Sequence, residues 1–157
     1  MASQRQDYIL RQIDLLRQFV ARLAGKRPDL ELEEALLLSF HLQEKLFPLP
    51  PAQFLRLALP DQISALRRSE SAADARDKCL AYAALLAETA ALYDYKGRDD
   101  LAAGARQMAL YAALSLALED RTDATAGVLI DRFVAVLDPS GLHAPVAELL
   151  ADYRRTT

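Results

Sequence analysis

Apolar residues recur along the first part of this chain at the spacing of a single helix face. The stripe alternates four and three positions apart and consists of Ile9, Ile13, Leu16, Val20 and Leu23. This spacing predicts an amphipathic helix over residues 4–24, and Gly25 follows where a helix commonly ends in a left-handed conformation. Packed against its own copy, the stripe would form the contact of a homodimer, so we expect these five residues to be a dimer surface.

A second helix is predicted between two segments that contain proline. It begins near Asp29, after Pro28, and must end by Phe47. The prolines at 48, 50 and 51 remove backbone donors and disfavour helical geometry in the residue before each of them. The centre of this segment, residues 35–40, is apolar on nearly every side. We therefore expect the helix to be central and buried.

Six further helices are predicted in the remainder of the chain. Two short ones begin at Pro51 and Asp61, and longer ones follow over residues 71–96, 98–119, 123–137 and from about 145. Gly97 separates the two longest helices. Gly104 and Gly127 fall inside predicted helices, where glycine costs up to about 1 kcal/mol relative to alanine. We interpret these two glycines as points of close packing between helices.

The composition supports a helical fold. The chain of 157 residues contains 30 Leu and 29 Ala, whose side chains lose little conformational freedom on entering a helix. Residues that favour strands are few, with only five Val and four Ile. The predicted fold class is all-α, a bundle or short superhelix of antiparallel helical hairpins with six to eight helices. This length is typical of one ordinary domain, so we expect residues 1–157 to form a single domain.

Two stretches resemble known helical proteins. In the hairpin over residues 80–118, small, aromatic and turn residues stand at Leu86, Ala90, Tyr93, Gly97, Ala102 and Ala109, and the hairpin resembles a tetratricopeptide repeat. Arg106 departs from that pattern, and no second copy follows 34 residues later. The segment from Asp7 to Ile13 is similar to the first helix, of DYIxRQI type, of small uncharacterised all-helical bacterial proteins. These resemblances imply a tetratricopeptide-like hairpin and a bacterial source, and they imply no activity.

Charge and hydropathy limit the classes of partner. The formal net charge of −3 is spread over both signs, so no overall field attracts nucleic acid or an anionic membrane. The longest unbroken apolar run, residues 79–87, is far shorter than the roughly twenty residues that span a bilayer. One cysteine and an N-terminus without an apolar signal segment favour the cytoplasm. We expect a cytoplasmic protein with no nucleic-acid or membrane partner.

The residues that usually carry catalysis or bind metals are few. His41 is followed by Glu44, the reverse of the Glu-to-His spacing of di-metal helical bundles, and His143 has no such neighbour. Cys79 lies within a predicted helix, and the five glycines are isolated instead of forming a phosphate-binding loop. We therefore expect no catalytic residue, metal or cofactor. An enzyme with dispersed carboxylates remains an alternative, which would require two buried acidic side chains with perturbed pKa values.

The most distinctive polar stretch, residues 93–100, lies at the turn of the predicted hairpin. Tyrosine and arginine are enriched in binding hot spots, so the candidate partner-binding residues are Tyr93, Tyr95, Lys96 and Arg98. In a purely structural interpretation Tyr93 packs in the hairpin, Gly97 makes the turn, and Asp99 and Asp100 begin the next helix.

Two functions are consistent with these observations. The first is a non-catalytic helical protein–protein interaction module, with self-association as a homodimer or with another protein as partner. The alternative is a small-molecule-binding or sensor bundle with an apolar pocket between helices, lined by Phe40, Tyr82, Met108 and Tyr111.

Overall fold

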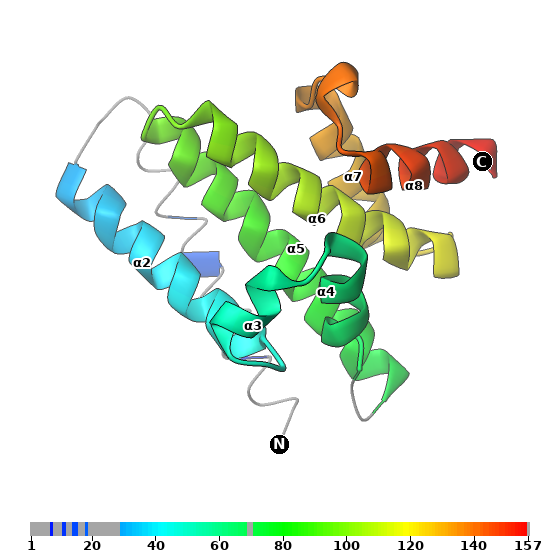
Figure 1. Cartoon of the computed structure of the whole chain (residues 1–157), viewed down its shortest axis with the longest axis horizontal. Coiled ribbons are helices and arrows are strands. Elements are labelled where there is room, and N and C mark those ends of the chain that lie inside the picture. The colour runs from blue at the N-terminus through cyan, green and yellow to red at the C-terminus, as the bar shows by residue number, and fades with distance from the viewer. Residues whose placement is uncertain are drawn as a thin grey trace.

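The structure of the chain is a computed structural model that describes residues 29–68 and 71–156, together with Asp7, Arg11, Asp14, Leu15 and Gln18. The two continuous ranges contain seven α-helices and one 3-10 turn, and neither contains a strand (Figure 1). The helices are α2 (Asp29–Leu46), α3 (Pro51–Arg56), α4 (Leu59–Leu66), α5 (Ala72–Tyr95), α6 (Asp99–Glu119), α7 (Ala124–Val136) and α8 (Ala144–Arg155), with the 3-10 turn at Pro139–Gly141. The predicted all-α fold is confirmed.

Helices α5 and α6 form an antiparallel hairpin at the centre of the fold (Figure 1). The Ser71 hydroxyl caps α5 by accepting a hydrogen bond from the backbone N–H of Asp74 at 3.1 Å. Gly97 makes the turn with a φ of 78°, a left-handed conformation that residues with a Cβ rarely adopt. Both helices bury many alanines, so their backbones approach closely, and Cys79 Sγ lies 3.9 Å from the carbonyl oxygen of Ala112.

The other helices pack on the sides of this hairpin. Helix α2 lies beside α5, whereas α7 and α8 lie beside α6 (Figure 1). Helix α4 contacts both α5 and α6. The hydrophobic core therefore forms around the hairpin, where Leu85 and Leu92 of α5 and Leu110 and Leu114 of α6 are fully buried.

Among the described helices α2 is peripheral, and the expectation that it would be central and buried is wrong. Its main packing within the described residues is against α5, and Leu37, Leu38 and Phe40 are 67%, 37% and 38% exposed. An apolar stretch specifies that a helix has several faces able to pack, but it does not specify that a neighbour covers each of them. Within the described ranges, α5 and α6 are the helices with neighbours on both sides.

Among the described helices, α6 is long and apolar enough to cross a membrane by length and composition. Of its most apolar window, 56% is buried inside the protein, against α5, α7 and α8. A mostly buried core helix passes the same test of length and composition, so this one helix is weak evidence for a membrane span.

Three aromatic rings fix the proline-rich segment after α2 onto the hairpin. The rings of Phe47 and Phe54 stack with centroids 4.2 Å apart, and Phe54 meets Tyr82 of α5 edge-to-face at 6.3 Å. We call Phe47, Phe54 and Tyr82 the aromatic cluster. The Tyr82 hydroxyl is buried and has no hydrogen-bond partner among the described residues, and burial raises its pKa above the ordinary value, with a smaller contribution from Cys79.

An ion-pair network joins four segments at the opposite end of α5 from Gly97. It consists of Arg67 after α4, Arg76 of α5, Glu119 of α6 and Asp123 before α7. Arg76 Nη2 lies 2.5 Å from Asp123 Oδ2, and its Nη1 lies 3.4 Å from Glu119 Oε2. Asp123 also caps α7 by accepting a hydrogen bond from the backbone N–H of Ala126, and this bond, followed by Arg76, holds the pKa of Asp123 below its usual range.

Replacing Tyr82 with phenylalanine is expected to leave the free energy of unfolding unchanged or to raise it by about 1 kcal/mol, because the buried hydroxyl without a partner carries a desolvation cost. Tyr82→Ala, which removes the ring, should instead lower it by roughly 3–5 kcal/mol. Urea denaturation of the two variants measures both effects. A loss of stability in Tyr82→Phe greater than about 1 kcal/mol would show that the hydroxyl has a partner.

Asp123→Ala is expected to lower the free energy of unfolding at pH 7 by about 1–2 kcal/mol, because α7 loses its cap and Arg76 loses a partner. The folded pKa of Asp123 is depressed, so its contribution is complete above the unfolded pKa of about 3.9 and is lost as the pH falls through the folded value. Thermal unfolding between pH 7 and pH 2 should therefore show the difference from wild type shrinking below about pH 4. Asp123→Asn, which keeps a good cap, should lose less than Asp123→Ala.

Candidate functional site

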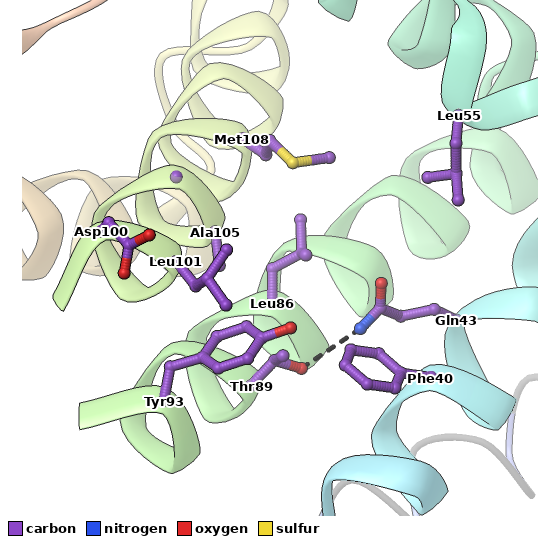
Figure 2. A pocket seen from close by; sticks show the side chains of 11 residues that line it. Phe40, Gln43, Leu55, Leu86, Thr89, Tyr93, Asp100, Leu101, Ala105 and Met108 are labelled. Carbon is purple, nitrogen blue, oxygen red and sulfur yellow. Dashed lines mark hydrogen bonds between the residues drawn. The ribbon is translucent and has the colours of Figure 1, made fainter. Parts of the chain in front are cut away.

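A groove with a volume of about 260 Å³ opens between α2, α5 and α6, with one contribution from α3 (Figure 2). We call it the central groove. Its lining residues are Phe40 and Gln43 of α2, Leu55 of α3, Leu86, Thr89 and Tyr93 of α5, and Asp100, Leu101, Gly104, Ala105 and Met108 of α6.

The walls of the central groove are apolar and accessible from solvent. Phe40, Leu55 and Leu101 are 38%, 56% and 38% exposed, although each is a large apolar side chain beside others of its kind. Leu86 is buried beneath them. The rings of Phe40 and Tyr93 lie 6.3 Å apart at an angle of 44°, so one end of the groove is aromatic. Apolar surface that gathers in a concave place is typical of a binding site, whereas single exposed apolar residues are not.

Glycine on α6 helps to keep the central groove open. A Cβ built at Gly104, which lines the groove, would meet no atom within 4 Å, and the same is true of Gly127 on α7. The interpretation of both glycines as points of close helix packing is therefore wrong. At Gly104 the missing side chain leaves space that a larger residue would fill.

Two polar side chains form a short hydrogen-bonded chain within the groove. Thr89 Oγ1 donates to the carbonyl oxygen of Leu85, one turn earlier in α5, at 2.8 Å. Gln43 Nε2 in turn donates to Thr89 Oγ1 at 3.3 Å. Both side chains come from residues that are more than nine-tenths buried. A buried amide at this position gives an otherwise apolar groove a directional polar group.

The structure places the four candidate partner-binding residues at the hairpin turn in different surroundings, with Lys96 and Arg98 exposed and the two tyrosines half-buried. Tyr93 is partly buried and lines the central groove. Burial raises the pKa of its hydroxyl, and the nearby charges of Lys96 and Arg98 act in the opposite direction. Tyr95 is partly buried against the core, and Lys96 Nζ pairs with Glu33 Oε1 of α2 at 2.5 Å.

Arg98 reaches the groove indirectly. Its Nε and Nη2 donate to the two carboxylate oxygens of Asp100, each at 3.2 Å, and Asp100 is a lining residue. These hydrogen bonds hold the pKa of Asp100 below its usual range, so the groove has a negative group on its rim whose charge is largely balanced by Arg98.

The structure also separates the residues expected to line an apolar pocket. Phe40 and Met108 both line the central groove. Tyr82 belongs to the aromatic cluster and is fully buried. Tyr111 is partly buried, and the carboxylate of Asp61 in α4 contributes to raising its pKa, after the larger effect of burial. The candidate dimer stripe, Ile9, Ile13, Leu16, Val20 and Leu23, lies outside the described residues.

Groups that could support catalysis are not gathered at any described site. His41 and His143 are exposed, and burial raises the pKa of the Cys79 thiol to about 12, which keeps it protonated and unreactive near neutral pH. Glu88 is the one carboxylate in the described ranges that is buried, and its Oε1 lies 3.9 Å from Arg132 Nη1 of α7. Within those ranges, no three His, Cys, Asp or Glu side chains lie close enough to hold a metal ion.

Comparisons of the chain with protein-family models, with curated proteins and with solved structures found no match. Sequence reasoning named Phe40, Tyr93 and Met108 as candidate site residues and missed the other eight lining residues of the central groove, Gln43, Leu55, Leu86, Thr89, Asp100, Leu101, Gly104 and Ala105. One signal was present, at Gly104: a glycine inside a predicted helix, where alanine would be more stable.

Gly104→Ala is expected to raise the free energy of unfolding by up to about 1 kcal/mol, because alanine favours helix and its methyl group meets no neighbour. Gly127→Ala, also inside a helix with open space around it, should have an effect of the same sign. Urea denaturation of both variants tests this. A loss of stability at either position would restore the interpretation of close helix packing there.

Proposed function

We propose that this chain is a non-catalytic helical interaction module and that the central groove binds an apolar segment of a partner protein. The observation that carries the proposal is a concave apolar surface that the folded chain leaves open, with Phe40, Leu55 and Leu101 at 38%, 56% and 38% exposure. Leaving large apolar side chains in contact with water is unfavourable, and covering them on association is the main source of favourable free energy in protein binding.

The size of the groove favours a protein segment over a free metabolite. Pockets for drug-sized ligands usually measure roughly 300–1,000 Å³, and the central groove has about 260 Å³. Apolar surface also continues beyond the groove, since Leu37, one helical turn before Phe40, is 67% exposed. A helix or extended peptide that inserts one or two side chains and lies across α2 would cover both features.

The proposal keeps the tetratricopeptide-like α5–α6 hairpin as the supporting unit, on the strength of its helix-turn-helix form with Gly97 at the turn. Its helices, of 24 and 21 residues, are longer than those of a tetratricopeptide repeat of about 34 residues, so the likeness is one of form alone. In this proposal the module acts in a bacterial cytoplasm and self-associates as a homodimer through the first-helix stripe. A small-molecule ligand is the second candidate, favoured by the buried amide of Gln43 in the groove.

Site-specific photo-crosslinking in the native cell tests the proposed function. The photoreactive residue p-benzoylphenylalanine replaces Leu101 at the groove, and in a matched control it replaces Val128, which is 67% exposed on α7 and does not line the groove. Irradiation is expected to give a discrete adduct from position 101 and none of the same mass from position 128.

Two glycine variants make this experiment specific for the groove. Gly104→Leu places a side chain in the central groove, whereas Gly127→Leu adds the same side chain to α7, and neither Cβ meets an atom within 4 Å. The adduct should disappear with Gly104→Leu and persist with Gly127→Leu. An adduct that survives Gly104→Leu, or that forms equally from position 128, would contradict the proposal.

A further inference from the structure

We infer that the central groove selects an aromatic side chain that carries a hydrogen-bond donor, a tyrosine or tryptophan of the partner segment, over a purely apolar side chain. The inference rests on the proposed function and adds the chemistry of the side chain that enters the groove. It is based on three features: the amide oxygen of Gln43, which accepts no hydrogen bond from the described residues, the aromatic rings at one end of the groove, and the volume of the groove.

The hydrogen bonds around Thr89 determine which end of the Gln43 amide faces the groove. The single hydroxyl proton of Thr89 is donated to the Leu85 carbonyl, so Thr89 Oγ1 can only accept a further bond. An amide nitrogen satisfies that need and an amide oxygen does not, which places Gln43 Nε2 toward Thr89. Figure 2 shows the amide oxygen turned away from Thr89, toward the space between Leu86 and Leu55.

Gln43 Oε1 is therefore an acceptor that the fold leaves unused. It has no hydrogen-bond partner among the residues that the structure describes, although Gln43 is only 9% exposed. Water can reach it while the groove is empty. A purely apolar occupant would displace this water and leave a buried acceptor without a partner, whereas an occupant with a donor would restore the bond.

The surroundings of this acceptor suit a ring. Phe40 and Tyr93 present aromatic surfaces at one end of the groove, and Met108 supplies a flexible thioether that packs well against ring edges. A cavity of about 150 Å³ is large enough to hold benzene, so the roughly 260 Å³ here accommodates a ring with its hydroxyl or N–H substituent. A phenol or an indole has both the ring and the donor.

Two small molecules that differ by one hydroxyl test the inference. The probes are p-cresol, which reproduces the tyrosine side chain, and toluene, which reproduces that of phenylalanine. Titrations of the whole chain are followed by NMR through the Met108 methyl and the Gln43 side-chain amide. We expect both signals to shift and p-cresol to bind about tenfold more tightly than toluene, the effect of one hydrogen bond to a buried acceptor.

A variant of similar shape tests whether Gln43 is the cause. Gln43→Met removes the amide and keeps the length of the side chain, so it should abolish the preference for p-cresol or reverse it. Gly104→Leu, which fills the groove, should weaken the binding of both probes. Circular dichroism verifies folding of the variants, and the comparison of probes in the wild-type chain remains decisive if Gln43→Met does not fold.

A third probe, N-acetyl-L-tyrosinamide, carries the peptide groups of a tyrosine within a protein. If this probe binds at least as tightly as p-cresol, the result supports a side chain of a partner protein as the occupant. If p-cresol binds and this probe does not, the occupant is a small free phenol and not a partner side chain. Toluene binding as tightly as p-cresol would overturn the inference and leave the proposed function standing. If neither probe shifts the groove signals, the inference fails, and the crosslinking at position 101 decides the proposed function separately.

Discussion

Close packing between the two longest described helices positions everything else in this fold. Helices α5 and α6, of 24 and 21 residues, bury alanine at many positions, and a side chain of one reaches the backbone of the other where Cys79 Sγ lies 3.9 Å from the Ala112 carbonyl oxygen. Small residues permit short distances between helix axes, and larger residues set the packing of the outer helices. The hairpin consequently serves as the support on which α2, α7 and α8 are arranged (Figure 1).

The central groove follows from this arrangement. Helix α2 packs beside α5, so the space between α2 and α6 is bounded by three helices but filled by none of them. On the α6 side, Gly104 and Ala105 contribute little volume, and on the α2 side Phe40 stands at the edge. The Gln43–Thr89 hydrogen bond then joins α2 to α5 at this place, so the same contact that holds α2 in position also orients the one amide that an occupant can reach.

Sequence patterns predicted the helices well and their surroundings less well. The caps at Ser71 and Asp123 and the turn at Gly97 were predictable because each depends on a few neighbouring residues. The position of α2 was not, since an apolar helix does not reveal which faces its neighbours cover. The turn residues illustrate the same limit, since the sequence does not show that Lys96 pairs with distant Glu33 and Arg98 with adjacent Asp100. Tyr93 alone of the four lines the groove.

A crystal structure of the whole chain with N-acetyl-L-tyrosinamide would test the central claim most directly, that the central groove is a binding site for an aromatic side chain with a donor. The account predicts the phenol ring among Phe40, Leu86 and Met108, with its hydroxyl within hydrogen-bond distance of Gln43 Oε1. A ring bound elsewhere on the molecule, or a groove closed by its own side chains in the presence of the compound, would contradict it.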